Sequence, residues 1–241
     1  MFNCISKDKT IKILSSNLTS AEGWSTAAPF SSFDSDGFSV QPRSPYNANN
    51  LINKNGEDFV AWCWKAGGAA VTNTDGTITS QVSANTEAGF SIVSYTGNVT
   101  QGATFGHGLN SAPKMVIIKS RTTALPFTIY NSNIGATKYL YLPSTNGAGI
   151  YDFWNNTDPT DTVVNLSSDV NVNGTLPMIA YCFAEVAGFS KFGSYVGNGS
   201  VSGPTITTDF EPAFVLIKPS GSPSAIALPF PMNGNRPTFN S

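Results

Sequence analysis

The chain carries one set of sequence blocks twice, in the same order. The blocks at 61–64, 89–98, 113–119 and 124–127 return at 180–183, 188–198, 212–218 and 227–230. For example, Ala61-Trp62-Cys63-Trp64 returns as Ala180-Tyr181-Cys182-Phe183. The copies are offset by roughly 100 to 120 residues, which is too long for a solenoid unit and suits a small domain. The repeat therefore predicts two related modules in one chain.

The simplest division places copy one at residues 1–130 and copy two at 131–241. Copy one has extra sequence between its first two blocks, at about 68–88, with Asp75-Gly76 in the middle. Asp-Gly is typical of tight hairpin turns, so this stretch predicts an added hairpin. A repeat does not reveal its own starting point. The boundary could equally fall after the strand at 115–119 and its counterpart in copy two.

Both copies are predicted to consist of β-strands. Runs of β-branched and aromatic residues are separated by Asn-Gly and Gly-Asn turn formers. The clearest runs lie at 59–64, 90–95, 115–119, 127–130, 139–142, 178–183, 189–195 and 214–217. No window shows an apolar stripe of helical spacing and length. The expected fold is all-β, with two tandem β-sandwich modules of jelly-roll type.

The three cysteines are interpreted as structural. Cys63 and Cys182 take the same place in the two copies, within apolar runs, so both are expected at equivalent buried strand positions. Trp62 and Trp64 lie two residues apart and are expected to be buried on one face of the same strand. With Cys4 the count is odd and fits no framework spacing, which favours a protein that does not depend on disulfides.

Charged residues are scarce in this sequence, and this argues against one class of partner. Charged residues make up 12% of the 241 residues and the net charge is −2. Nucleic-acid binders need clustered Lys and Arg, so nucleic acid is not an expected partner. Neither an apolar leader at the N-terminus nor a membrane-spanning run is recognisable. We expect synthesis in a cytoplasm without a signal peptide, and no membrane insertion.

No residue pattern predicts catalysis, a metal or a cofactor. His107, the single histidine, lies among turn residues without a nucleophile motif, so a structural role is preferred to a catalytic one. Asp34-Ser35-Asp36-Gly37 resembles the start of a calcium loop but lacks the closing Glu, and turn formation explains it better. A pair of carboxylates for glycoside hydrolysis is not singled out among Asp152, Asp158, Asp161 and Asp169.

Aromatic side chains in loops offer the remaining candidate site. The flat face of an aromatic ring can stack on the C–H groups of a sugar, although most aromatic residues fill cores. Among the aromatic residues of the predicted loops, Tyr46, Tyr151 and Trp154 are the candidates for contact with a glycan.

The repeated blocks resemble a repeat found in virion proteins of marine bacteriophages. The residues that carry the resemblance are Phe59-Val60-Ala61-Trp62-Cys63-Trp64-Lys65-Ala66-Gly67-Gly68, the run from Gly89 to Asn98, Gly106-His107-Gly108-Leu109, Ala112-Pro113-Lys114-Met115 and the run from Ala180 to Tyr195. This family is of uncharacterised function and is interpreted as structural or tail-fibre-like. It implies no catalytic residues.

The sequence therefore predicts a virion structural protein rather than an enzyme. The resemblance implies a tail-fibre or receptor-binding protein located in the virion, which contacts other virion proteins and a host surface glycan. A homo-oligomer is expected, and a trimer if the protein is a tail fibre. The alternatives are a capsid decoration protein and a carbohydrate-binding module without catalysis.

Overall fold

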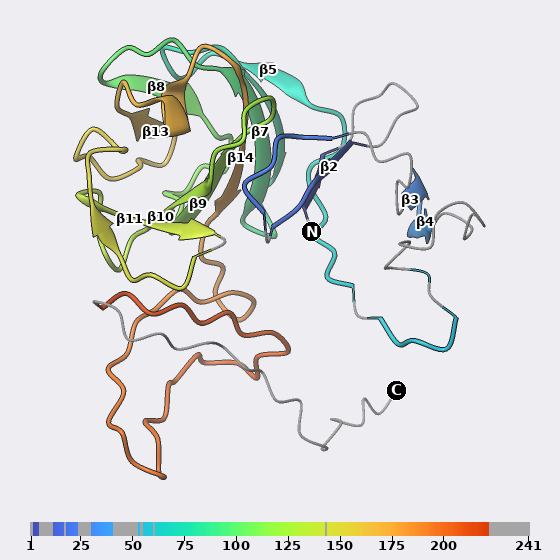
Figure 1. Cartoon of the computed structure of the whole chain (residues 1–241), viewed down its shortest axis with the longest axis vertical. Coiled ribbons are helices and arrows are strands. Elements are labelled where there is room, and N and C mark those ends of the chain that lie inside the picture. The colour runs from blue at the N-terminus through green and yellow to red at the C-terminus, as the bar shows by residue number, and fades with distance from the viewer. Residues whose placement is uncertain are drawn as a thin grey trace.

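One large antiparallel sheet dominates the computed structural model, which describes residues 2–4, 12–16, 18–23, 30–40, 53, 55–59, 61–142 and 144–221. Figure 1 shows this sheet curving through the upper left of the molecule. The spatial order of its eight strands is β12-β11-β10-β9-β14-β7-β6-β5. The strands are β5 (Val71–Asn73), β6 (Ser80–Asn85), β7 (Phe90–Thr96), β9 (Met115–Ser120), β10 (Phe127–Asn131), β11 (Lys138–Leu142), β12 (Gly149–Ile150) and β14 (Pro177–Phe183). The all-β prediction is confirmed at this level.

Smaller elements surround the sheet. The pair β8 (Ala103–Gly106) and β13 (Val163–Leu166) packs against one of its faces, and α1 (Val170–Asn173) leads into β14. Nearer the N-terminus, β1 (Phe2–Cys4) pairs with β2 (Lys12–Leu14), and β3 (Phe30–Phe33) pairs with β4 (Phe38–Val40). In the β3–β4 turn, Asp34 accepts hydrogen bonds from the hydroxyls of Ser32 and Ser39, both at 2.8 Å. Turn formation thus accounts for the sequence from Asp34 to Gly37.

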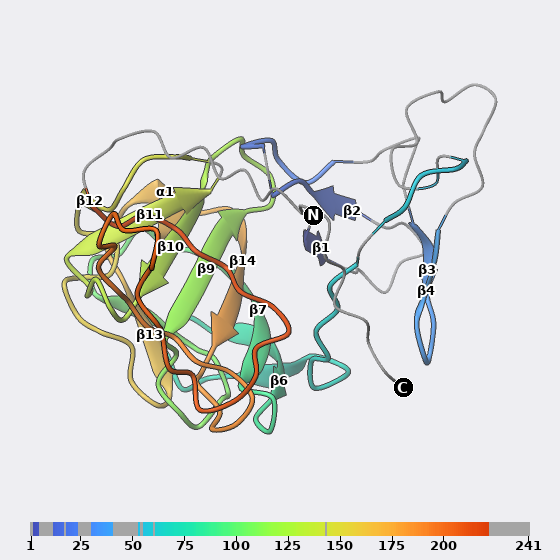
Figure 2. The same ribbon diagram turned by 90° about the horizontal axis from the view of Figure 1, so that it is seen from below.

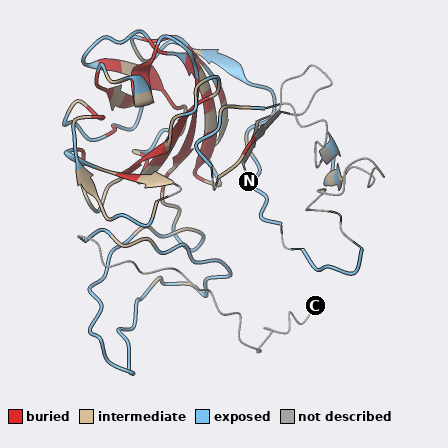
Figure 3. Ribbon diagram, viewed as in Figure 1, coloured by how far each residue is buried: buried red, intermediate tan, exposed pale blue. Residues whose placement is uncertain are grey.

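The central strands of the sheet are covered on both faces, because alternate residues of β7, β9, β10 and β14 enter different apolar clusters. In β9, Val116 and Ile118 pack with β8, β13 and Trp154, whereas Ile117 points to the opposite cluster. Leu14 from β2 is fully buried in that second cluster. Burial on both sides explains the continuous apolar runs of the central strands. Figure 3 shows this buried interior in red.

The two segments that flank the sheet differ from the prediction. The described residues of 61–70 and 184–221 contain no strand. The second of these segments passes below the sheet in Figure 1 and in front of it in Figure 2. Cys63 is exposed while Cys182 is buried in β14, and Trp62 and Trp64 are exposed as well. The prediction of equivalent buried cysteines is therefore wrong. A strand-like sequence forms a strand only where another strand can pair with it.

Strands on the two sides of residue 130 belong to the same sheet. The expected boundary at 130/131 falls inside β10, which pairs with β9 on one edge and with β11 on the other. Within the 68–88 stretch, β5 and β6 form an antiparallel hairpin. We call the part of the chain from β5 to β14, at 71–183, the central module; Leu14 and Glu22 of the N-terminal segment contact it.

A buried asparagine joins the end of β7 to the start of β14. The side chain of Asn173 accepts a hydrogen bond from the Asn98 amide at 2.8 Å and donates to the carbonyls of Thr100 (2.9 Å) and Ser167 (2.8 Å). Gly97 lies against the same backbone, where an added Cβ would approach the Gly174 oxygen to 2.3 Å. The phenol of Tyr95 donates to the carbonyl of Val172 at 2.6 Å. These contacts give structural roles to Tyr95, Gly97 and Asn98 at the end of β7.

Replacement of Asn173 should destabilise the central module more than its position in a short helix suggests. Asn173→Ala leaves buried backbone groups without partners, and we expect a loss of about 3 kcal/mol in the free energy of unfolding. The matched control is Asn171→Ala, because Asn171 is less buried and its side chain donates to Asp169 at 2.8 Å rather than to backbone carbonyls. We expect the control to change stability by less than about 0.5 kcal/mol. Urea unfolding measures both values, and similar losses in the two variants would contradict this role.

Candidate functional site

Four aromatic rings gather at the β11–β12 edge of the sheet. Tyr139 and Tyr141 lie on the same face of β11 because side chains of a strand alternate. Their ring centroids are 4.6 Å apart, and Phe153 lies 4.8 Å from Tyr139. Tyr151 follows β12, with its ring 4.6 Å from that of Phe153. Gly149 pairs with Tyr139, and a Cβ at 149 would lie 2.4 Å from that tyrosine ring, so glycine leaves room for the stack.

Polar groups surround the exposed member of this cluster. The hydroxyl of Tyr151 donates to Asp169 Oδ2 at 3.0 Å, and this bond is the main reason that the pKa of Tyr151 is raised. The other oxygen of Asp169 accepts from the amide of Asn171 at 2.8 Å, which fixes the carboxylate at the start of α1. The position of the ring is therefore set by packing on one side and by a hydrogen bond on the other.

Gln101 connects the neighbouring loops to the same region. Its amide nitrogen donates to Asp152 Oδ2 at 3.0 Å and to Asn155 Oδ1 at 2.7 Å. Its carbonyl oxygen accepts from the Ser168 amide at 3.0 Å. We call Gln101, Tyr139, Tyr141, Tyr151, Asp152, Asn155 and Asp169 the Tyr151 patch. An exposed ring with carboxamides and carboxylates beside it can stack on a sugar and exchange hydrogen bonds with its hydroxyls.

The three aromatic candidates have different outcomes. Tyr151 is half exposed and lies in the patch. Trp154 is fully buried and donates from its indole N–H to the carbonyl of Lys138 at 3.2 Å, so its proposed role as a glycan contact is wrong. Its turn folds back over the core and carries the ring inward. Tyr46 lies outside the described residues.

Sequence reasoning missed most of the patch. Tyr139 and Tyr141 were assigned to a strand, and nothing marked Gln101 as a neighbour of residues about fifty positions away. The available signal was the spacing of Tyr139 and Tyr141, because side chains two residues apart in a strand lie on the same face. The contact between the Gln101 loop and the loop at 152–155 depends on long-range folding and leaves no local pattern.

The remaining candidates have structural partners. His107 is buried; its Nδ1 accepts from the Leu109 amide and its Nε2 donates to the Thr160 carbonyl, both at 3.2 Å. These two bonds describe a neutral ring, and burial lowers its pKa. Asp158 accepts from the Tyr130 hydroxyl at 2.9 Å. Among the residues that the structure describes, no group of three or more His, Cys, Asp or Glu is arranged to hold a metal ion.

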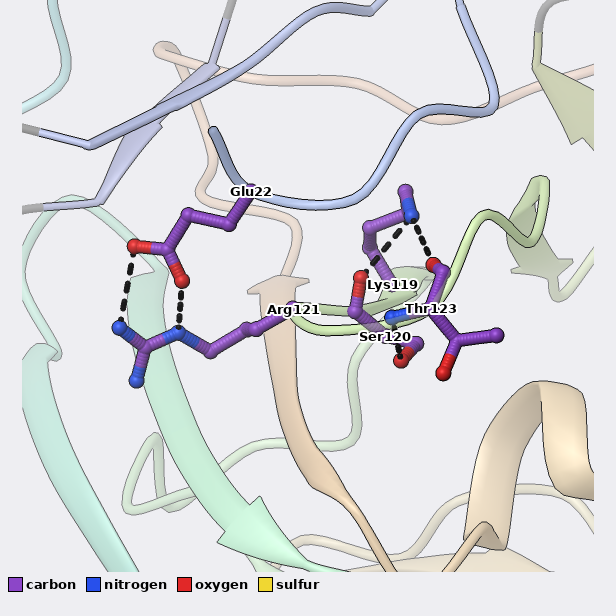
Figure 4. Close-up of polar contacts among 5 residues, drawn as sticks. All are labelled: Glu22, Lys119, Ser120, Arg121 and Thr123. Carbon is purple, nitrogen blue, oxygen red and sulfur yellow. Dashed lines mark hydrogen bonds and ion pairs between the residues drawn. The ribbon is translucent and has the colours of Figure 1, made fainter. Parts of the chain in front are cut away.

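A buried lysine lies at the end of β9 (Figure 4). Lys119 Nζ donates to the carbonyls of Ser120 (2.9 Å) and Thr123 (3.1 Å) and lies 5.8 Å from the centre of the Phe127 ring. Beside it, Arg121 forms a two-bond ion pair with Glu22, at 2.7 and 3.1 Å. Burial lowers the pKa of Lys119 to about 8. These contacts anchor the turn after β9 and the segment that contains Glu22.

The chain belongs to a family described as "Domain of unknown function (DUF7483)". The family model matches residues 7–226, which is most of the chain. No curated protein and no solved structure matches it. In the part of the chain that the structure describes, no helix has the length and apolar character needed to cross a membrane.

Lys119 should make stability depend on pH above neutrality. Because the folded-state pKa is about 8 and the ordinary value is 10.5, the unfolded chain binds more protons between these limits. The free energy of unfolding should therefore rise with pH from about 8 to about 10.5, relative to that of Lys119→Met. Urea unfolding of both proteins at a series of pH values measures this difference. A constant difference across that range would contradict a lowered pKa of Lys119 in the folded protein.

Proposed function

We propose that this protein is a structural component of a phage virion, of the tail-fibre or receptor-binding type, and that its central module binds glycans on the host surface. The resemblance of the repeated blocks to phage virion repeats supports the location. The low charge of the chain supports a neutral target, since attraction of an anionic polymer needs clustered basic residues. Other virion proteins and further copies of the same chain are the proposed partners, and a tail fibre would be a trimer.

The observation that carries glycan binding is the half-exposed Tyr151 ring between fixed polar groups. Packing against Phe153 and the bond to Asp169 hold the ring in place before a ligand arrives. A ring that is already ordered loses little conformational freedom on binding. Gln101 and Asp152 then provide donor and acceptor atoms on the same surface. One such patch suits weak binding per site, which several copies in a virion would strengthen through multivalency.

The chemistry of the Tyr151 patch indicates which class of glycan it binds. Carboxylates and carboxamides recognise hydroxyl-rich neutral sugars, whereas a strongly acidic glycan would be repelled by Asp152 and Asp169. Binding requires no bond cleavage, and the proposal assigns no catalytic step. A capsid decoration protein remains the second candidate on the same resemblance. A reconstruction of the particle distinguishes the two candidates, because a tail fibre and a capsid lattice have different symmetry.

Removal of the Tyr151 ring should weaken glycan binding without unfolding the module. We expect Tyr151→Ala to reduce affinity for the best ligand on an array of neutral glycans at least about tenfold, which is about 1.4 kcal/mol. Tyr195→Ala is the matched control, because Tyr195 is equally exposed but lies outside the patch. No binding by the unaltered protein at millimolar glycan would contradict the glycan role. Absence of the protein from purified particles would contradict the virion location.

A further inference from the structure

The two flanks contain counterparts of central strands, and among the described residues no strand pairs with them. The counterpart of β9 lies at 212–218 and that of β7 at 188–195, while 61–64 corresponds to the end of β14. Val215 is 51% exposed although its counterpart Val116 is fully buried. Phe189 is 61% exposed, and its counterpart Phe90 lies in the core. Such a concentration of exposed apolar side chains marks a surface that another element covers.

The central module shows how these blocks fit together. There β14 lies between β7 and β9 and is antiparallel to both. Residues 61–64 in the N-terminal flank therefore correspond to the middle strand, and the C-terminal flank holds the counterparts of both its neighbours. Neither flank contains the full set, but together they do.

A second pair of motifs is divided between the flanks in the same way. In the central module, the end of β7 and the turn after it (Tyr95 to Asn98) contact Asn171-Val172-Asn173-Gly174 through the bonds to Val172 and Asn173. The sequence contains one other Asn-x-Asn-Gly, at 53–56, shortly before the 61–64 block. The counterpart of the turn, Tyr195-Val196-Gly197-Asn198, lies in the C-terminal flank. Both halves of this contact are thus present, one in each flank.

Two ring contacts join the flanks, and both involve residues that this correspondence places close together. In the central module Phe183 pairs with Met115. The corresponding residues are Trp64 and Phe214, whose ring centroids are 6.3 Å apart. Trp62, two residues before Trp64 and on the same face of an extended segment, would be the diagonal neighbour of Phe214, and its ring lies at 5.4 Å.

The N-terminal and C-terminal flanks are both joined to the same end of the central module. Trp64 lies against Phe90 and Phe183, with ring centroids at 6.5 and 6.3 Å, where β7 starts and β14 ends. The amide of Ala184 donates to the carbonyl of Gly89 at that same end, four residues before Gly188. The segment that arrives at Trp64 and the segment that departs at Gly188 therefore run in opposite directions. This is the antiparallel arrangement that β14 and β7 adopt.

We propose that residues 61–64 are the middle strand of a second sheet, which they form with 189–195 and 213–218 of the same chain. The N-terminal and C-terminal flanks thereby make one module whose sequence is interrupted by the central module. Contacts within one chain are preferred to contacts between chains because the two segments are already held close together. This inference does not rest on the proposed function.

Disulfide trapping tests the pairing and its register. Cys182 pairs with Val116, so Cys63 should lie opposite Val215. Cα atoms of antiparallel pairs are about 4.5 to 5.5 Å apart, within disulfide range. The full chain with Cys4→Ser and Val215→Cys is oxidised mildly and analysed by non-reducing electrophoresis and peptide mass mapping. The matched control is Leu216→Cys, since Leu216 is similarly exposed but its side chain would point to the other face. Cys182 is buried, and burial raises the pKa of its thiol to about 12, so it remains unreactive.

We expect a cross-link within the monomer that forms at least about tenfold faster with Val215→Cys than with Leu216→Cys. Equal rates for the two variants would mean that the segments are close but unpaired, which overturns the proposal. Cross-links found only between chains would show that a second copy supplies the strand, and would overturn the assignment to one chain. Absence of any cross-link to Cys63 would overturn it as well.

Discussion

β14 is hydrogen-bonded along both edges and covered on both faces. It therefore contacts both neighbouring strands and both apolar clusters of the central module. Seven residues pair with β7 and six pair with β9. Met178, Ala180 and Cys182 enter one apolar cluster, while Ile179 and Tyr181 enter the other. Because the side-chain period is two, a shift by one residue would exchange these sets. The register of this strand therefore fixes both cores together.

The start of β14 is fixed by polar contacts rather than by packing. Asn173 bonds to backbone groups of two loops, and Gly97 allows those loops to approach closely. The same loops continue into Gln101 and Asp169, which hold the polar side of the Tyr151 patch. The geometry of the proposed glycan surface thus depends on the strand that organises the core.

The sequence predicted the strands of the central module well because each has a local signature and a partner nearby. The runs at 90–95, 115–119 and 178–183 coincide with β7, β9 and β14 to within a residue or two. The same reasoning predicts strands at 61–64, 189–195 and 214–217, where the propensity is high but the described residues form no strand pairing. The patch was predicted only through Tyr151, since Gln101 and Asp169 reach it through contacts that no local pattern records. The prediction that Trp154 contacts a glycan was wrong because the polar turn that contains it directs the ring into the core.

Limited proteolysis of the full chain tests most directly whether the structural unit is the central module at 71–183 or two copies divided near residue 130. The continuous pairing of β9, β10 and β11 predicts that the connection between β10 and β11 resists cleavage. The smallest resistant fragment should then contain residues 71–183 without a cut, as read by mass spectrometry. Early cleavage at 131–137 that yields two resistant halves would contradict the account.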